Sequence, residues 1–317
     1  MDSSVSDAVA LAQALKSEAL NIGFTTAGIA GLEPFEGQEF VDKWLGAGFH
    51  GEMDYLSSRP EFLRHPDKIL AGARSALVVT LNYNQSLPGG AKVARYALGR
   101  DYHKVLRSKL KLLGQKFDAE LGSWRACVDT APLPERELAH RAGLGWFGKN
   151  TNLIDSRRGS WFFIGVLLTT RLLPADQPSA GGCGTCTKCI DACPTGAIVQ
   201  LGGRWAVDSR KCLSYLTIEH RSPFEEETDL HGWLYGCDIC QEVCPFNEPR
   251  SSQPLRAVET TEPQFFESPF TATAEEVAQW GEADWDSATR GRALRRAKLD
   301  QWKRNAVAIL RSEPKKL

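Results

Sequence analysis

Apolar positions follow two different periods in the first half of the chain. Val, Ala and Leu recur at helical spacing over 5–21, with charged residues between them and Gly23 after them as a stop signal. By contrast, 75–83 (SALVVTLNY) and 160–170 are short β-rich runs, which are typical of buried strands. The stretch 101–121 is amphipathic with a helical period. These patterns predict two long helices and two buried strands.

Shorter patterns fill the intervals between these elements. Further strands are predicted at 24–30 and 124–129, and further helices at 36–47 and 134–142, the last with a proline near its first turn. Helices and strands therefore alternate over residues 1–175, which argues for one α/β (α+β) domain.

Two more segments follow this predicted domain. Residues 176–250 are loop-rich and hold eight of the nine cysteines, so metal rather than a large core is expected to stabilise them. Residues 251–317 begin irregular and end helical, as a short helical C-terminal tail. A chain of 317 residues is long enough for two or three such domains.

Charge and composition narrow the setting in which the protein works. The formal net charge is −1, so the chain as a whole lacks a nucleic-acid-binding charge, and any such surface must be local. The first residues lack the basic and long apolar regions of a secretory signal. The most apolar run, 161–168, is far too short to span a bilayer. We expect a cytoplasmic protein with no membrane partner.

The cysteines carry the strongest chemical signal. The run from Cys183 to Cys193 reads C-x2-C-x2-C-x3-C-P, the bacterial ferredoxin signature in which the fourth Cys serves the other cluster. A second run keeps the C-x2-C-x3-C-P ending and lacks one leading Cys, which the isolated Cys212 can supply. Two crossed sets of four thiolates result, enough for two [4Fe–4S] clusters: Cys183, Cys186, Cys189 and Cys244, and Cys193, Cys212, Cys237 and Cys240.

Zinc and disulfides are the alternative uses of these cysteines. Zinc pairs usually read C-x2-C twice, a pattern that leaves the two C-x3-C-P endings unexplained. Structural disulfides are less favoured still. Cys127 lies outside both sets.

A glycine motif and two acids need weighing. Gly143 to Gly148 matches G-x-G-x-x-G, but a helix is predicted before it where the dinucleotide fingerprint needs a strand. Asp129 lies where a predicted strand meets a loop, a position that lines a crevice in many folds, although an N-cap or a solvated Asp is the structural alternative. Asp101 has the same alternative, as the N-cap of the helix that it opens.

His103 belongs to a broken motif. Asp101-Tyr-His103 resembles the start of the D-x-H-x-x-G motif of proteins that ligate cobalamin through His, but the Gly is absent. We therefore expect His103 to bond to protein partners or lie at the surface rather than ligate a metal.

One stretch near the end of the chain is strongly basic. Residues 290–304 hold seven basic side chains against one acid, Asp300, with Trp302 among them. We read the stretch as one helix whose Arg292, Arg295 and Arg296 contact phosphates, with a solvated helix face as the alternative.

Several longer motifs run through the chain from about residue 8 to residue 310. They are 50–54 (HGEMD), 95–104 (RYALGRDYHK), 128–132 (VDTAP), 137–149 (ELAHRAGLGWFGK), both cysteine runs, 212–219 (CLSYLTIE), 235–240 (YGCDIC) and 303–306 (KRNA). Together they resemble the epoxyqueuosine reductases, the cobalamin-dependent iron–sulfur enzymes of tRNA queuosine synthesis.

The resemblance implies a fold, two kinds of cofactor and a reaction. An N-terminal cobalamin-binding domain, of a fold shared with the reductive dehalogenases, would precede a ferredoxin-like domain with two [4Fe–4S] clusters. Cobalamin would bind base-off with no His ligand, which agrees with the broken motif at His103. The family reduces epoxyqueuosine to queuosine at the wobble position of tRNA with a GUN anticodon, using an external electron donor.

Site residues follow from the same resemblance. Asp129 matches the family's proton donor and Asp101 a second active-site acid, and we expect burial to raise the pKa of Asp129 so that it can protonate the leaving oxygen. Cobalamin contacts are implied at Arg64, Ala94, Asp129, Arg136, Leu153, Ser214 and Gly236. Ala94 stands where some members carry a Cys, so that thiol is not essential here if the function holds.

Contacts to tRNA are expected at Lys149, Glu219, His220 and Arg221, beside Arg292, Arg295 and Arg296. Two other functions remain open: a cytoplasmic reductive dehalogenase, and a ferredoxin-like electron carrier with an accessory domain. We expect a monomer.

Overall fold

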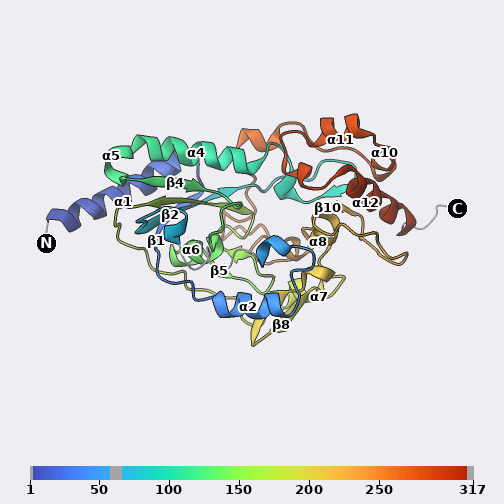
Figure 1. Cartoon of the computed structure of the whole chain (residues 1–317), viewed down its shortest axis with the longest axis horizontal. Helices are drawn as coiled ribbons and strands as arrows, with labels where there is room; N and C mark the ends of the chain where they lie inside the picture. The colour runs from blue at the N-terminus through green and yellow to red at the C-terminus, as the bar shows by residue number, and fades with distance from the viewer. Residues whose placement is uncertain (1–2, 58–65, 313–317) are drawn as a thin grey trace.

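A computed structural model describes residues 3–57 and 66–312 (Figure 1). Its first half is built on a four-stranded sheet in the order β1-β2-β7-β4. The strands are β1 Thr26–Gly31, β2 Ser75–Asn82, β4 Trp124–Cys127 and β7 Phe162–Thr169. Every pairing in this sheet is antiparallel, so the predicted mixture of helix and sheet is confirmed, in an α+β arrangement.

Alternation along the central strands gives the sheet two apolar faces. In β2, Leu77 and Val79 point into one core while Ala76 and Val78 point into another, as the two-residue period of a strand requires. A residue run that is buried on both faces reads as a continuous apolar stretch, which is why 75–83 could be recognised as a strand from the sequence.

Helices cover both faces of this sheet (Figure 1). On one face α4 Tyr102–Lys116 packs Leu106, Leu110 and Leu113 into the core together with α1 Ser3–Asn21. On the other face lies α6 Glu135–Arg141, so close to β1 that a Cβ on Gly28 would clash with the Ala142 carbonyl oxygen. A glycine at position 28 therefore lets the helix approach the strand.

Most of the remaining elements are short, and they are divided between the two halves of the chain. The helices are α2 Gln38–Gly46, α5 Asp118–Leu121, α7 Lys188–Asp191, α8 Leu213–Ile218, α9 Ile239–Glu242, α10 Ala274–Ala278, α11 Glu282–Thr289 and α12 Leu299–Ser312. The strands are β3 Lys92–Val93, β5 Trp146–Phe147, β6 Leu153–Ile154, β8 Ile198–Leu201, β9 Arg204–Val207 and β10 Trp233–Tyr235. Single 3₁₀ turns lie at Asp54–Leu56, Pro66–Lys68, Arg95–Ala97, Ser209–Lys211, Pro263–Phe266 and Ala293–Arg296.

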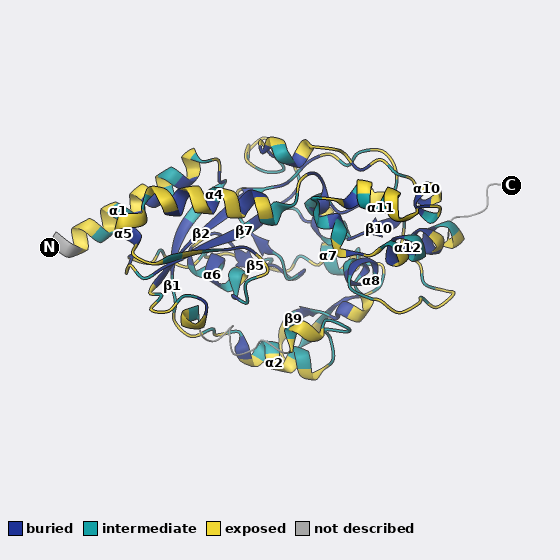
Figure 2. Ribbon diagram, turned by 45° about the horizontal axis from the view of Figure 1, so that its top comes forward, coloured by how far each residue is buried: buried dark blue, intermediate teal, exposed yellow. Residues whose placement is uncertain are grey.

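A second core joins all three predicted segments. Ala94 and Leu98 from the first, Tyr235 from the second and Trp302 from the third are buried in one apolar cluster. The parallel pairing of β3 with β10 links the first two of these segments directly. Burial colouring shows buried positions of β10 and α12 together (Figure 2). The cysteine-rich segment is thus packed against a sizeable core as well as being a metal-binding loop region.

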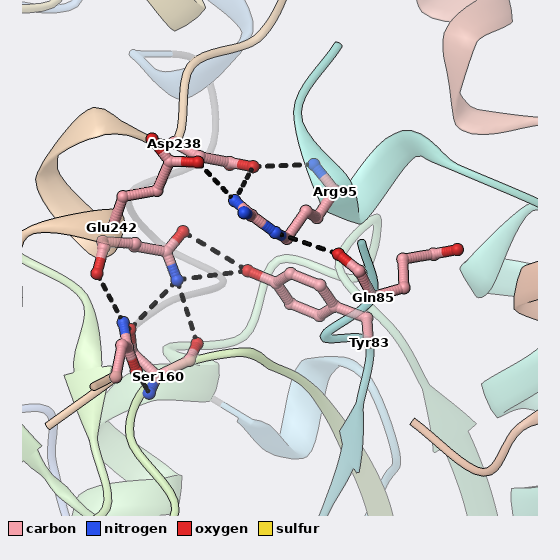
Figure 3. A network of polar contacts seen from close by, with 8 residues as sticks. Tyr83, Gln85, Arg95, Ser160, Asp238 and Glu242 are labelled. Atoms are coloured by element: carbon pink, nitrogen blue, oxygen red, sulfur yellow. Dashed lines mark hydrogen bonds and ion pairs between the residues drawn. The ribbon is translucent and has the colours of Figure 1, made fainter. Parts of the chain in front are cut away.

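Polar side chains reinforce the same junction (Figure 3). The Arg95 guanidinium donates to the carboxylates of Asp238, at 3.1 Å, and Glu242, at 2.8 Å, and the Arg95 backbone N–H donates to Asp238 at 2.8 Å. Asp238 is 2% exposed and lies between Cys237 and Cys240. This buried network fixes the second cysteine run against the sheet domain.

No helix in the part of the chain that the structure describes is long and apolar enough to cross a membrane.

Candidate functional site

The four thiols of the first predicted set face one another. Cys183, Cys186, Cys189 and Cys244 all line one small cavity. Burial, together with the negative charges of Cys183, Cys244 and Cys186, raises the pKa of Cys189 to about 11. Each thiol therefore lies within electrostatic reach of the others, as the ligands of one cluster must.

The second set converges in the same way. Burial raises the pKa of Cys237 to about 12, with further contributions from the charges of Cys212 and Cys193. Burial also raises the pKa of Cys240, and the charges of Cys212, Cys237 and then Cys189 add to it. Because Cys189 belongs to the first set, the two sets adjoin each other. Among the described residues no three His, Cys, Asp or Glu side chains come together tightly enough to hold a single metal ion.

A separate cluster of acids and a histidine lies where α4 begins and β4 ends. His103 Nδ1 is 2.8 Å from Asp101 Oδ1, and His103 Nε2 is 3.0 Å from Asp129 Oδ2. The Tyr102 hydroxyl donates to the same Asp129 oxygen at 3.0 Å. Asp101 also caps α4 by accepting the His103 backbone N–H, so its predicted N-cap role is confirmed. His103 bonds to protein partners, as the broken motif predicted.

The protons of this cluster are not where the sequence suggested. Burial lowers the pKa of His103, but its hydrogen bonds to Asp101 and Asp129 outweigh burial and raise the pKa to about 9. Burial raises the pKa of Asp129, but the hydrogen bond and charge of His103 outweigh burial and lower it. At neutral pH the pair is an imidazolium and a carboxylate. The expectation that burial protonates Asp129 is therefore wrong for this arrangement, because the proton resides on His103.

The Asp129 side chain remains accessible to water. It is 59% exposed although the surrounding protein is dense enough to desolvate its carboxylate. The positive charge of Arg296 contributes to the lowered pKa of Asp129. Burial raises the pKa of Tyr55, and the charges of Glu219, Arg296 and Asp129 also act on it. A cavity of about 600 Å³ is lined by Glu219 and Arg296 among others. Asp129 thus lies near the charged cavity that is formed by the opposite part of the chain.

The cavity wall carries most of the residues expected to meet tRNA. Arg296 donates twice to the Glu219 carboxylate, at 2.9 and 2.7 Å, and lies 5.4 Å over the Tyr55 ring. Arg221, Arg295 and Lys298 also line it. This wall combines arginines and a lysine, and the partly exposed ring of Tyr55 lies against Arg296.

Of the other expected tRNA contacts, Lys149 and His220 are already engaged within the protein and Arg292 is partly buried. The Lys149 ammonium donates to the carbonyls of Gly184 and Cys186, both at 2.9 Å, so it braces the first cysteine loop. His220 Nδ1 is 3.1 Å from a Glu52 oxygen. Arg292 is half-buried, and burial lowers its pKa.

The predicted single helix over 290–304 is wrong. Arg290 ends α11, the chain turns at Gly291 with φ +77°, and a 3₁₀ turn intervenes before α12 begins at Leu299. Trp302 is fully buried in the second core rather than exposed between basic residues. Gly291, in a left-handed conformation, separates α11 from the rest of the basic stretch, which is then shared between the 3₁₀ turn and α12.

Part of the basic stretch stabilises the protein instead of facing solvent. The Arg304 guanidinium donates to the backbone carbonyls of Leu216, His220 and Ser222. It also lies 3.9 Å over the ring of Phe224. Arg304 therefore fixes the loop that follows α8, next to the cavity.

The implied cobalamin contacts fall on two sides, which different parts of the chain form. Ala94 and Gly236 touch, because the Ala94 N–H donates to the Tyr235 carbonyl at 2.8 Å and a Cβ on Gly236 would come within 2.5 Å of the Ala94 Cβ. Ser214 lies in α8, whose Thr217 hydroxyl accepts the Gly236 N–H. On this side two implied contacts, Ser214 and Gly236, lie within two positions of the cluster ligands Cys212 and Cys237.

Arg136 and Leu153 belong to the other side. The Arg136 guanidinium donates to the Thr151 carbonyl at 2.5 Å, and its side chain is water-accessible although burial lowers its pKa. Leu153 is buried in β6. Arg64 lies outside the described residues.

Sequence reasoning missed Tyr102 and Glu135. Glu135 accepts the Asp129 backbone N–H at 2.6 Å, and burial, followed by the charge of Asp129, raises its pKa to about 8. In the sequence Glu135 looks like an ordinary acid in the first turn of a helix. Only its proximity to Asp129, six positions earlier in a sharp turn, distinguishes it.

Two family models match the chain. The model described as "Epoxyqueuosine reductase QueG, DUF1730" matches residues 64–130, and the model described as "4Fe-4S double cluster binding domain" matches residues 182–247. The first match ends directly after Asp129, and the second contains both sets of thiols. The cysteines thus form a double iron–sulfur site, and the zinc and disulfide alternatives are set aside.

Known proteins agree with both models. An epoxyqueuosine reductase from Synechococcus sp. (strain RCC307) is 42% identical over 309 residues, which cover 94% of this chain and 93% of that protein. A solved epoxyqueuosine reductase with a tRNA-Tyr epoxyqueuosine-modified stem loop is 25% identical, with a TM-score of 0.80 over 95% of this chain and 80% of the other. The Bacillus subtilis enzyme, solved with its catalytic Asp loop swung out of the active site, is 26% identical, with a TM-score of 0.78 over 95% and 81%.

A more distant likeness concerns the fold alone. A catabolic reductive dehalogenase is 18% identical, with a TM-score of 0.50 over 84% of this chain and 35% of the other. The predicted relation between the two groups is confirmed at the level of the fold. The long, high-identity matches decide the family, and the chain belongs to the epoxyqueuosine reductases.

Proposed function

We propose that the protein reduces epoxyqueuosine to queuosine in the wobble position of tRNA with a GUN anticodon. The observation that carries the proposal is the Asp129 carboxylate, water-accessible and bonded to a protonated His103, close to a charged cavity of about 600 Å³. The solved relative that holds a modified tRNA stem loop supports the choice of substrate.

The reaction defines what the site must supply. An epoxide with two electrons and two protons gives a carbon–carbon double bond and one water molecule. The oxygen is a poor leaving group unless it is protonated, so a proton donor must reach it. Asp129 is accessible to water, and the proton held by His103 can pass through the Asp129 carboxylate to the oxygen. We assign Asp129 as the group that contacts the oxygen, with His103 as its proton source and Asp101 as the second carboxylate that keeps His103 charged.

Cobalamin, bound base-off, and the two [4Fe–4S] clusters supply the electrons when they are present. The water-accessible Arg136 would offer a cation to an acetamide or propionamide oxygen of the corrin. Ala94 and Gly236 are buried against each other, so they would contribute a close-packed backbone near the corrin rather than an open surface. Leu153 and Ser214 complete the proposed contacts.

The wall with Glu219, Arg221 and Arg296 is proposed to receive the anticodon loop. Taking a base out of its stack exposes its faces and edges, which aromatic and arginine side chains recognise. Tyr55, under Arg296, offers such a ring beside Asp129. We propose that the protein works as a monomer in the cytoplasm, with an external electron donor whose identity the chain does not specify.

Anaerobic incubation with epoxyqueuosine-containing tRNA, followed by mass analysis of the nucleosides, tests the proposal. Queuosine should replace epoxyqueuosine only when a reductant is present. Reduction of an organohalide with no change in tRNA would favour the dehalogenase alternative. Electron transfer without bound corrin absorption would favour the electron-carrier alternative.

A further inference from the structure

The carboxyl group of Glu135 holds the backbone of Asp129 rather than its side chain. The Asp129 N–H donates to Glu135 Oε1 at 2.6 Å. Asp129 itself has φ +51°, in the left-handed region that residues with a side chain seldom adopt. Directly after it the Thr130 N–H donates to the Val128 carbonyl at 2.5 Å, which closes a sharp turn. One side chain therefore lies at the base of a strained turn that carries the proposed proton donor.

We propose that Glu135 is a positioning residue, whose carboxyl latches this turn and keeps the Asp129 carboxylate within reach of His103 and Tyr102. The inference rests on the proposed function, in which Asp129 protonates the leaving oxygen. It adds Glu135, a residue to which the proposed function gives no contact with the epoxide oxygen or with a cofactor.

Glu135 is part of a helix that packs against the sheet, whereas Asp129 lies in an exposed turn. Glu135 is the first residue of α6, which is anchored by the buried Leu138 and Ala139 against the sheet. Asp129 follows β4 through only Val128, and its side chain is 59% exposed. Its carboxylate is bonded only from the α4 side, by Tyr102 and His103 among the described contacts. The bond to Glu135 therefore ties the turn to α6 as well as to α4, and an unsupported left-handed residue is expected to relax.

Glu135 can accept the Asp129 N–H whether or not its carboxyl group is ionised. Asp129, His103 and Arg136 all act on it, and burial with the Asp129 charge raises its pKa to about 8. A neutral carboxyl group still accepts an N–H bond through its carbonyl oxygen. Glutamine offers the same oxygen without the titrating proton, so it should preserve the latch, whereas alanine should release it.

Amide hydrogen exchange on the holoenzyme tests the latch directly. In Glu135→Ala the Asp129 amide, followed in peptides covering 128–133, should exchange about tenfold faster, since loss of one intramolecular hydrogen bond is worth about a factor of ten. Glu135→Gln should exchange like the unchanged protein. Glu137→Ala is the matched control, because Glu137 lies in the same helix and pairs with Arg141 instead. The control should leave the Asp129 amide unaffected.

Steady-state kinetics with tRNA complete the test. Glu135→Ala should lower kcat about tenfold or more with little change in KM, and Glu135→Gln should restore most of it. Unchanged Asp129 exchange in Glu135→Ala, or a Gln variant as impaired as the Ala variant in both measurements, would overturn the latch. If the unchanged enzyme did not reduce epoxyqueuosine at all, the proposed function would fail, while the exchange experiment would still decide the latch.

Discussion

His103 Nε2 lies 3.0 Å from the Asp129 carboxylate, and its other ring nitrogen lies 2.8 Å from Asp101. An imidazole held between two carboxylates keeps its proton to higher pH than a free one, and its pKa is raised to about 9. The stability that this pairing contributes is fully present below about pH 6.5, the ordinary histidine value, and is lost as pH rises through about 9.

Replacing the histidine should therefore flatten the pH dependence of folding. The free energy of unfolding of His103→Gln should differ from that of the unchanged protein most at pH 6 and least near pH 10. Anaerobic urea titrations across that range measure the difference. His231→Gln, at an exposed site, is the control. A difference that stayed constant from pH 6 to 10 would mean that His103 is not charged in the folded protein.

The Asp129 carboxylate itself can be tested by an isosteric change. Asp129→Asn keeps the shape and removes the proton-carrying group, so turnover should fall by about 10² or more, the usual loss for a general acid. The corrin spectrum should persist, since binding does not depend on this charge alone. Near-normal turnover would instead assign the proton-transferring role to Asp101. Turnover is measured by anaerobic nucleoside analysis.

The crossing of the cysteine sets predicts different lesions from neighbouring substitutions. Fully loaded protein should contain about eight irons, four for each cluster. Cys189→Ser should damage the cluster that lines the cavity with Cys183 and Cys244, whereas Cys193→Ser, four positions later, should damage the other. Iron analysis with electron paramagnetic resonance distinguishes the clusters. Identical spectra for the two variants would contradict the crossed assignment.

Salt dependence of tRNA binding tests the cavity wall. Arg296 and Lys298 line the cavity, so replacing both with Ala should weaken binding and reduce the slope of log K against log salt by about 0.7–0.9 for each phosphate that is no longer neutralised. Arg290→Ala is the matched control, because Arg290 is exposed on the same stretch and pairs with Asp286. An unchanged slope in the double variant would place the tRNA-binding surface elsewhere, and fluorescence anisotropy at several salt concentrations measures it.

Asn305 should be important for stability although it carries no charge. Its fully buried amide donates to the carbonyls of Thr217, in α8, and Leu234, in β10. Asn305→Ala leaves both acceptors buried without this partner, which costs about 2–3 kcal/mol of unfolding free energy. Arg311→Ala, on the exposed side of the same helix, should cost little. Equal midpoints for the two variants in urea would exclude the role assigned to Asn305.

Local patterns predicted most of the elements and the cluster ligands. The strand at 75–83 and the helix opened by Asp101 were recognisable because a period of apolar residues records which faces are buried. The cysteine sets were recognisable because ligand spacing is a local property. Asp129 could be placed at a strand end for the same reason.

The chemistry of the site depended on contacts that no local pattern records. His103 keeps its proton through Asp101, two positions away, and also through Asp129, 26 positions away, and the charge of Arg296 is balanced by Glu219, 77 positions away. Such pairs form only when the sheet domain and the C-terminal elements come together. The basic stretch at 290–304 was consequently predicted to be one exposed helix. In the structure Trp302 is buried in the second core, and Arg304 bonds to backbone carbonyls of the protein.

The position of α12 has a consequence for the synthesis of the protein. Trp302 stacks on Tyr235 in β10. The Asn305 amide donates to one backbone carbonyl in α8 and to one in β10. A ribosome adds the residues that hold Cys212 and Cys237 well before it adds these partners. The ligand loops of the growing chain therefore lack these packing partners until about 70 residues after Cys237 have been added. Delivery of iron and sulfide to this chain is expected to follow the synthesis of α12, and a pulse-labelled chain stopped before Leu299 should not retain its clusters.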